Sequence, residues 1–254
     1  MPDRSRSSSD ANSQPGPRLA LHAGPLLDRA AAARLDAAAT TRCGIPGLLL
    51  MEHAAIGSTA LIERELADTG VERVVVLCGP GNNGGDGWAI ARLLRRHDVS
   101  VEVIELAPPA APGDAATNRA IAIAFGITVR PASDLQDPTI AQTLEDALVV
   151  DALFGTGLAR PLAGPAAALV DAVRGRPARV VAIDVPSGLD ADTGSVLGTC
   201  LPADVTATMV APKVGLLSRG SEDLRGRIEI VDIGVPPELI DAFDVSGRNP
   251  PNRG

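Results

Sequence analysis

Apolar residues in the first part of the chain recur at helical spacing. Between Leu26 and Leu66 they return every three or four positions, and the segment Gly-Ile-Pro-Gly at 44–47 interrupts them. Apolar side chains at this spacing line one face of an amphipathic helix, whereas Gly and Pro mark a turn. We therefore expect two packed N-terminal helices.

From residue 73 onward the pattern changes to short β-branched runs separated by helical stretches. The expected strands, apolar along their length as in sheets covered on both faces, are 73–78, 99–106, 147–150, 179–183, 205–210 and 228–231. The expected helices between them are 88–96, 115–125, 140–146 and 166–174. This alternation predicts an α/β fold: a three-layer αβα Rossmann-like sandwich with a mostly parallel sheet and two N-terminal helices.

Composition predicts one domain with a tail at each end. A chain of 254 residues, 45% of them hydrophobic, can bury one substantial core. Residues 1–20 are rich in Ser, Asp, Arg and Pro, and residues 244–254 show no apolar periodicity. We expect disordered tails at 1–20 and 244–254 and a single domain at 21–243.

Charge and cysteine content narrow the class of protein. The formal charge of −8 and the isoelectric point near 4.9 oppose binding to nucleic-acid backbones and anionic membranes. No apolar run approaches the roughly 18 residues that span a bilayer. Cys43, Cys78 and Cys200 are widely spaced and form no CxxC pattern, which favours a reducing compartment. We expect a cytoplasmic protein that binds neither nucleic acid nor membranes.

A glycine-rich segment follows the first expected strand. Residues 79–87 read Gly-Pro-Gly-Asn-Asn-Gly-Gly-Asp-Gly, and the next helix is expected to begin near Trp88. Glycine permits positive φ and close approach of a ligand, and a helix N-terminus attracts anions. The segment therefore predicts a cradle for a pyrophosphate, although a Gly-rich turn without a ligand has the same composition.

The same segment also fits a dehydrogenase fingerprint. Gly79, Gly81 and Gly84 have the GxGxxG spacing, and Glu102 or Glu105 lies roughly 20 residues further on. This spacing alone is a weak indication. The Asn and Asp side chains between the glycines favour another task, because their oxygens suit a hard cation or a ribose.

Carboxylates follow two later strands of the expected sheet. Asp151 ends the strand at 147–150 and Asp184 ends the strand at 179–183. The carboxyl ends of parallel strands share one edge, so polar side chains distant in sequence converge there. The side chains expected to converge are Asn82, Asn83, Asp86, Asp151, Asp184 and Ser187. An Asp after a strand is more often a cap or turn former, and this alternative applies to Asp86, Asp190 and Asp192.

Lys213 is the only lysine of the chain, and it follows an expected strand. A phosphate contact is one interpretation, but a surface lysine is the more common one, and we expect the latter. The histidines His22, His53 and His97 have no ligand-spaced partner, so we expect no catalytic role for them.

Three stretches, in this order, resemble the NAD(P)H-hydrate epimerases: residues 79–87, residues 150–157 (Val-Asp-Ala-Leu-Phe-Gly-Thr-Gly) and residues 184–190 (Asp-Val-Pro-Ser-Gly-Leu-Asp). Shorter similarities extend from Leu35-Asp36 to the segment 233–236, so the resemblance covers nearly all of the expected domain. Members of this family interconvert the R and S forms of hydrated NADH and NADPH, which carry a hydroxyl on carbon 6 of the reduced nicotinamide ring. A dehydratase then repairs the S form.

The resemblance also implies site residues. It implies Asp184 as the catalytic carboxylate, and a potassium ion bound by Asn83, Asp151 and Ser187. The residues implied in substrate binding are Asn82, Asn83, Gly84, Gly85, Asp86, Gly155, Thr156, Gly157, Leu158, Ala159, Arg160, Pro161 and Asp184. Amide, carboxylate and hydroxyl oxygens suit a hard cation better than a transition metal.

The expected function is epimerisation of these damaged cofactors. Asp184 would assist loss of the carbon 6 hydroxyl and stabilise the ring iminium, after which water adds to the opposite face. The alternatives are an NAD(P)-dependent Rossmann oxidoreductase and a non-catalytic dinucleotide-binding scaffold. By resemblance we expect a homodimer and a dehydratase that is a separate protein.

Overall fold

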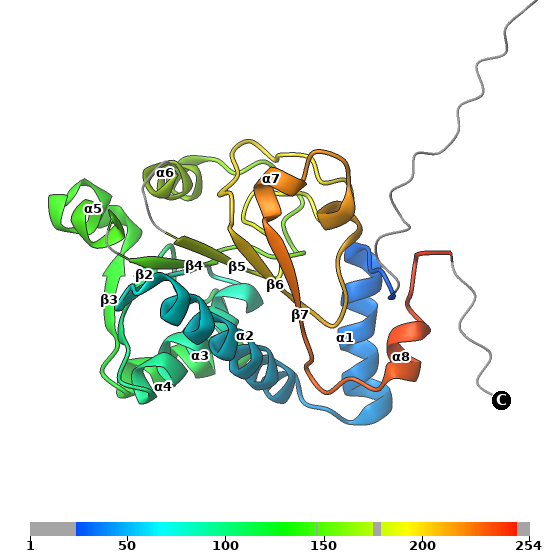
Figure 1. Cartoon of the computed structure of the whole chain (residues 1–254). Helices are drawn as coiled ribbons and strands as arrows, with labels where there is room; N and C mark the ends of the chain where they lie inside the picture. The colour runs from blue at the N-terminus through cyan, green and yellow to red at the C-terminus, as the bar shows by residue number, and fades with distance from the viewer. Residues whose placement is uncertain (1–23, 146, 175–178, 248–254) are drawn as a thin grey trace, which may run out of the picture.

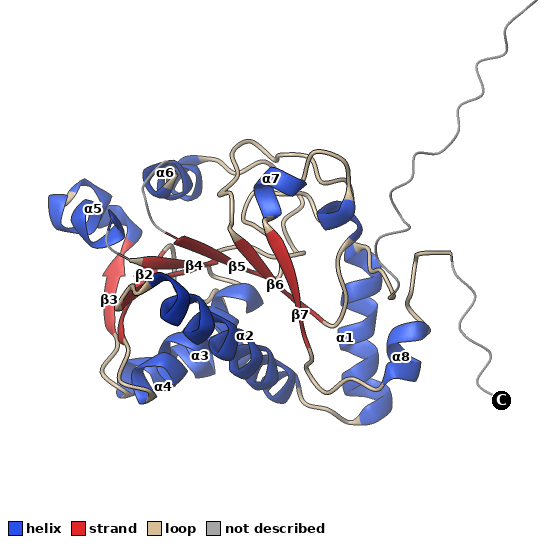
Figure 2. Cartoon of the chain, viewed as in Figure 1, coloured by secondary structure: helices blue, strands red, loops and turns tan. Residues whose placement is uncertain are grey.

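Seven parallel strands form one sheet in the computed structural model, which describes residues 24–145, 147–174 and 179–247 (Figures 1 and 2). The strand order is β3-β2-β1-β4-β5-β6-β7, and every neighbouring pair is parallel. The strands are β1 (Arg73–Cys78), β2 (Ser100–Glu105), β3 (Thr128–Pro131), β4 (Leu148–Ala152), β5 (Arg179–Ile183), β6 (Val205–Met209) and β7 (Arg227–Val231).

Helices cover both faces of this sheet. In Figure 1, α2, α3 and α4 lie on one face and α5, α6 and α7 on the other, while α1 and α8 stand beside the β7 end. The helices are α1 (Arg29–Cys43), α2 (Gly47–Thr69), α3 (Asn82–Arg96), α4 (Asp114–Ala124), α5 (Pro138–Glu145), α6 (Gly164–Val173), α7 (Glu222–Arg225) and α8 (Pro237–Asp241). The three-layer α/β fold, the parallel sheet and the two N-terminal helices are therefore confirmed.

The alternation of side chains along β1 explains why the strands are apolar throughout. Val74, Val76 and Cys78 pack in the core beneath α1 to α4. Val75 and Leu77 point the other way and pack in a second core with α5 and α6. Because successive side chains of a strand point to opposite faces, a sheet covered on both faces needs apolar residues at every position.

Strand β3 was absent from the sequence expectations. It spans four residues at the edge of the sheet, pairs only with β2 and ends at Pro131. Its positions are only partly buried or exposed, so it lacks the apolar run that marks the other strands. An edge strand tolerates proline because one of its sides needs no hydrogen-bond donor. A short strand with proline and low burial therefore lacks the pattern by which strands are recognised in a sequence.

The start of α3 also differs from the expectation. The helix begins at Asn82 rather than near Trp88, so most of the glycine-rich segment is helical. None of its glycines has a positive φ. Apart from Gly81, they are required for packing: a Cβ on Gly84 would lie 1.8 Å from the carbonyl oxygen of Gly79, and one on Gly87 would lie 2.7 Å from the Cβ of Ala152. These glycines therefore allow close packing within the protein, a reason that differs from the expected positive φ and the expected approach of a ligand.

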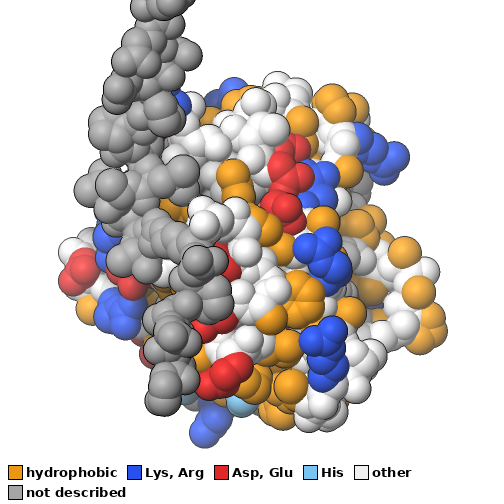
Figure 3. Space-filling model, turned by 90° about the vertical axis from the view of Figure 1, so that its right-hand side faces the viewer, with side chains coloured by type: hydrophobic (Ala, Val, Ile, Leu, Met, Phe, Trp, Pro, Cys, Tyr) orange, Lys and Arg blue, Asp and Glu red, His pale blue; other side chains and the backbone are white. Residues whose placement is uncertain are grey.

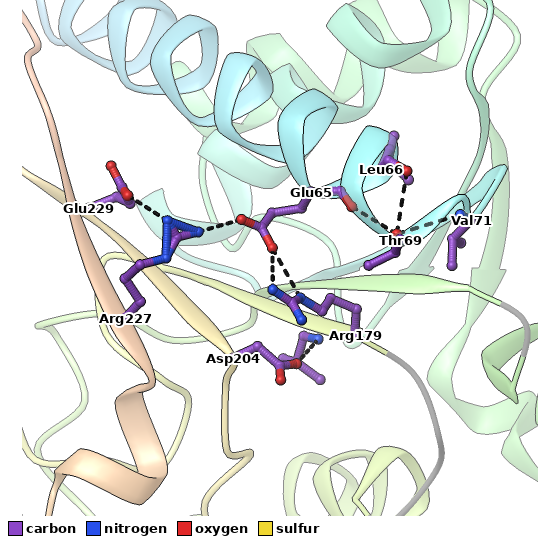
Figure 4. Close-up of polar contacts among 9 residues, drawn as sticks. Glu65, Leu66, Thr69, Val71, Arg179, Asp204, Arg227 and Glu229 are labelled. Atoms are coloured by element: carbon purple, nitrogen blue, oxygen red, sulfur yellow. Dashed lines mark hydrogen bonds and ion pairs between the residues drawn. The ribbon is translucent and has the colours of Figure 1, made fainter.

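A charged cluster fastens α2 across the amino ends of the strands (Figure 4). Glu65, whose side chain is 2% exposed, accepts hydrogen bonds from the Arg179 guanidinium at 2.6 and 3.0 Å through one carboxylate oxygen. Its other oxygen accepts a hydrogen bond from Arg227. Arg179 begins β5 and Arg227 begins β7, so one carboxylate joins α2 to two strands.

The chain ends lie partly outside the described residues. The tail expected at 1–20 is among the residues not described, whereas the contacts of the described chain extend beyond residue 243. The backbone N–H of Val245 donates to the carbonyl of Leu26 at 2.9 Å. Among the described residues no helix is both long and apolar enough to cross a membrane. On the face seen in Figure 3, Lys and Arg side chains stand in separate groups rather than in a continuous basic surface.

Candidate functional site

The site lies where the order of the strands reverses. The chain runs outward from β1 through β2 to β3 and then returns with β4 on the other side of β1. In open α/β sheets, ligands bind at the carboxyl ends of the strands at this switch point. A cavity of about 550 Å³ opens there, between α1 and α2 on one side and the loops after β1, β4, β5 and β6 on the other.

Asp184 lies in this cavity directly after β5. Its φ of +69° is one of three positive values at non-glycine residues that the described chain contains, and Asp tolerates this left-handed conformation better than most residues. One carboxylate oxygen contacts the Lys213 ammonium at 2.5 Å, and the other accepts the Thr156 N–H at 2.8 Å. Burial alone would raise the pKa of Asp184, but Lys213 and the Thr156 hydrogen bond outweigh it and lower that pKa.

Lys213 corrects the expectation of a surface lysine. Its side chain is 3% exposed, and the ammonium also donates to the Thr208 hydroxyl at 2.9 Å and the Met209 carbonyl at 3.1 Å. These three acceptors use all three ammonium hydrogens. The residue is buried because Leu27 pairs with its segment: the Leu27 N–H donates to Pro212 and the Leu27 carbonyl accepts from Val214.

Two further carboxyl groups line the same cavity. Burial first, then the charges of Asp184 and Asp36, raise the pKa of Asp86 well above its usual value. Burial and the charge of Asp184 also raise the pKa of Asp36, and Lys213 opposes both shifts. Three acids thus surround one lysine, and only the pKa of Asp184, which contacts the lysine directly, is lowered.

A second polar group lies beside and beneath the cavity. Asp151 and Ser187 are fully buried; the Ser187 hydroxyl donates to Asp151 at 2.6 Å, and the Ser187 N–H donates to the other carboxylate oxygen at 2.7 Å. Burial raises the pKa of Asp151 to about 6 despite these bonds. Both polar atoms of the Asn83 amide are buried without a hydrogen-bond partner among the described residues.

Most of the sequence-predicted substrate residues do line the cavity. Those that line it are Asn82, Asn83, Asp86, Gly155, Thr156, Gly157, Leu158 and Asp184. Those that do not are Gly84, Gly85, Ala159, Arg160 and Pro161. Gly84 and Gly85 are buried against neighbouring backbone and side chains, whereas Ala159, Arg160 and Pro161 are exposed beyond the rim.

Other candidate acids have structural partners. Glu105, at the end of β2, is held by the Arg119 guanidinium through bonds of 2.6 and 3.0 Å, and Glu102 lies 3.4 Å from Arg130. Neither glutamate lines the cavity. Asp190 accepts the N–H groups of the two residues that follow Ala191, so the alternative of a turn former is correct for it.

The sequence of the chain is similar to those of known proteins. Residues 47–215 match the family described as YjeF-related protein N-terminus. An NAD(P)H-hydrate epimerase of Levilactobacillus brevis is 40% identical over 208 residues, which cover 81% of this chain and 92% of that protein. One of Rhodopirellula baltica is 39% identical, with 83% and 85% covered. The chain belongs to the NAD(P)H-hydrate epimerase family. The expected family is therefore confirmed.

Other relatives of this epimerase-family chain are longer. A bifunctional NAD(P)H-hydrate repair enzyme of Salinibacter ruber is 41% identical over 227 residues, and the match spans 85% of this chain but 42% of that enzyme. Among solved structures, yeast ynu0 has a TM-score of 0.67 at 24% identity, with 75% of this chain and 82% of that chain covered. This structural likeness confirms the fold.

Sequence reasoning missed two charged residues of the site. Asp36 was noted only as part of the resemblance, and Lys213 was expected at the surface. The pattern that could have found Asp36 is helical spacing: Arg29, Ala32, Asp36 and Thr40 lie on one face of α1, and that face lines the cavity.

Proposed function

We propose that this chain interconverts the R and S forms of hydrated NADH and NADPH in the cavity, with Asp184 as the catalytic carboxylate. The observation that carries the proposal is the buried Asp184–Lys213 pair at the switch point, which keeps a carboxylate ionised inside a cavity that also contains carboxyl groups of raised pKa. Neighbouring carboxyl groups whose pKa values are shifted in opposite directions can divide the roles of acid and base between them.

Asp184 acts on carbon 6 of the nicotinamide ring. When the hydroxyl leaves this carbon, the ring nitrogen shares its lone pair and the ring becomes a cationic iminium. The negative charge of Asp184 stabilises that cation in a cavity where water is partly excluded. Lys213 and the Thr156 N–H keep the carboxylate in place, so little reorganisation accompanies the charge change.

The walls of the cavity bind the dinucleotide. Gly81, Asn82 and Asn83 stand at the N-terminus of α3, where unpaired N–H groups and the helix dipole favour the pyrophosphate. Leu50 and Met51 of α2 give the opposite wall an apolar surface against which a ring can pack. The raised pKa of Asp86 favours its neutral form, which can donate a hydrogen bond to a polar group of the substrate.

We also propose that one potassium ion binds to Asn83, Asp151 and Ser187. The fit rests on two features: the Asn83 amide oxygen is buried without a partner, and the Asp151 carboxylate is buried without a cation. Groups of three or more His, Cys, Asp or Glu that could hold a metal are absent from the described residues, so a site of neutral oxygens around one carboxylate suits a monovalent ion. When bound, the ion offsets the charge of Asp151.

The proposal includes a cytoplasmic homodimer that works with a dehydratase. Leu48, Leu49 and Ile56 lie exposed on one side of α2, with exposed fractions of 38%, 44% and 50%. Exposed apolar side chains that share a helix face are typical of an interface between subunits.

The test is conversion of R-NADHX and R-NADPHX to their S forms by the purified protein, followed by chromatography. The expected result is a rate above the spontaneous background with both substrates. Consumption of ordinary NADH with a hydride acceptor would favour an oxidoreductase, and binding without conversion would favour a scaffold.

A further inference from the structure

One face of α1 forms a wall of the cavity. Arg29, Ala32, Ala33, Asp36 and Thr40 all line it, at the three- and four-residue spacing of a single helix face. The remaining buried positions of α1 pack into the core. Beside Asp36 the wall consists of small alanines, which leave room for a flat ring next to the carboxyl group.

Asp36 is the acid of this wall, and it has no hydrogen-bond or ion-pair partner among the described residues. The charged groups that face it are Asp184 and Lys213, from the loops after β5 and β6, and Asp86 from α3. Arg29 shares its helix face but is bound at 2.9 Å to Asp190.

Epimerisation needs chemical assistance on both faces of the ring. The iminium is planar at carbon 6, so the hydroxyl that leaves one face must be replaced by water on the other. A carboxylate fixed against the sheet edge reaches one face only. Lys213 cannot assist the second face because its three hydrogens are already donated to Asp184, Thr208 and Met209.

We propose that Asp36 is a second catalytic carboxyl group, which acts on the face of the nicotinamide ring opposite to Asp184. The inference rests on the proposed epimerisation. The two groups approach from different walls, Asp36 from the helical wall of α1 and Asp184 from the sheet edge, and the cavity lies between these walls. The raised pKa of Asp36 and the lowered pKa of Asp184 leave one group protonated more readily than the other.

Two proton transfers accompany the exchange of the hydroxyl group, one on each face of the ring. The Asp36 carboxyl donates its proton to the carbon 6 hydroxyl, the C–O bond breaks with its electron pair on oxygen, and water leaves. The nitrogen lone pair forms the C=N bond of the iminium. A water molecule then attacks carbon 6 from the other face, Asp184 takes its proton, and the C=N π pair returns to nitrogen. Solvent then returns the proton from Asp184 to Asp36. Conversion of the S form to the R form follows the same steps in reverse, with Asp184 as the acid and Asp36 as the base.

The experiment compares Asp36→Asn with the wild type in the conversion of R-NADHX. Loss of a general acid lowers rates by about 100-fold or more. We expect kcat to fall by about 100-fold with KM within about 3-fold, and the fall of wild-type activity at alkaline pH to disappear in the variant. The matched control is Asp223→Asn, which changes an exposed carboxylate on α7, outside the cavity, and should keep the wild-type rate.

Each outcome decides the inference. If the wild type is active and the kcat of Asp36→Asn stays within about 3-fold of the wild-type value, the role of Asp36 is overturned and the proposed function is unaffected. A raised KM at unchanged kcat would make Asp36 a binding residue and also overturn it. A wild type without conversion would defeat both proposals. Thermal melting of the variant checks that it is folded.

Discussion

The carboxyl groups at the two edges of the sheet differ in their partners and in the direction of their pKa shifts. At the amino edge, Glu65 has both oxygens held by arginines, and although burial alone would raise its pKa, the hydrogen bonds from Arg227 and Arg179 lower it. At the carboxyl edge, one lysine lies among three acids and contacts only Asp184. The pKa values of the other two, Asp36 and Asp86, remain raised.

This difference in hydrogen bonding distinguishes a structural carboxylate from carboxyl groups that can act on a ligand. Both oxygens of the Glu65 carboxylate already accept hydrogen bonds from arginines, so this carboxylate is not available to a ligand. The Glu65 cluster therefore has a structural role, which is to attach α2 to the strands. In the cavity, Asp36 and Asp86 have no hydrogen-bond or ion-pair partner among the described residues, and the Asn83 amide is buried without a hydrogen bond. Unpaired polar groups cost stability, and a fold keeps them where a ligand will satisfy them.

Apart from removal of the Asp184 charge itself, the largest expected effect within this comparison comes from Gly155→Ala. An added Cβ would lie 2.5 Å from a carboxylate oxygen of Asp184 and 3.2 Å from the Asn83 amide oxygen, so both groups must move. Displacement of a catalytic group by about 1 Å costs about 100-fold in rate, and we expect that loss in kcat. Initial rates of R-to-S conversion measure it.

Gly157→Ala provides the comparison for this variant. A Cβ at position 157 would meet no atom within 4 Å, so this substitution should cost much less activity. Equal losses in the two variants would show that flexibility of the loop, and not the space beside Asp184, matters.

Glu65→Gln tests the other edge and should affect stability rather than activity. Both arginines keep their charge and lose the Glu65 anion. The effect is moderated because Arg227 keeps its ion pair with Glu229 and both arginines reach solvent. We expect a loss of about 2 kcal/mol in the free energy of unfolding, between the values for exposed and buried ion pairs. This corresponds to a fall in Tm of roughly 6 °C.

The control for Glu65 is Arg64→Gln, which removes a largely exposed ion pair of 3.9 Å with Glu229. Its melting temperature should stay within about 1 °C of the wild type. An equal loss in both variants, or a loss of conversion rate in Glu65→Gln well below its Tm, would contradict the structural role of the cluster.

The smallest expected effect is stabilisation by potassium. The pKa of Asp151 in the folded protein, about 6, lies above its usual value, so the ionised form is costly above that pH and a bound cation offsets the cost. Stabilisation by potassium should therefore be present at about pH 7.5 and vanish as the pH falls through about 6. At about ten times Kd it amounts to about 1.4 kcal/mol.

Melting curves in potassium chloride and in choline chloride of equal ionic strength measure this effect. Asp151→Asn should abolish the difference between the two salts. A difference that persists in this variant, or that persists at acid pH, would place the cation elsewhere.

Sequence patterns predicted the strands and most helices because buried parallel strands are apolar at every position. Strands β1 and β5 have the bounds that the pattern predicted. The pattern failed at β3, where burial is low, and at the start of α3, where glycines required by packing resemble a loop. Local composition cannot distinguish a glycine that turns the chain from one that lets two backbones meet.

The site was predictable to the extent that it follows strand ends. Asp184 and Asn83 reach the cavity because parallel strands share one edge. Lys213 was misplaced because its burial depends on pairing with Leu27, a contact between residues 186 positions apart that no local pattern contains. Asp36 comes from a helix that precedes the sheet, and its place in the cavity follows from tertiary packing.

The most direct measurement of the central claim is the rate of R-to-S conversion by Asp184→Asn. Asn tolerates the positive φ at this position and its amide oxygen can still accept from Lys213, so the variant removes the charge and the hydrogen bond from the Thr156 N–H. We predict a loss of about 1000-fold in kcat, measured well below the Tm of both proteins. A variant that converts R-NADHX at the wild-type rate would contradict the assignment of Asp184 as the catalytic carboxylate.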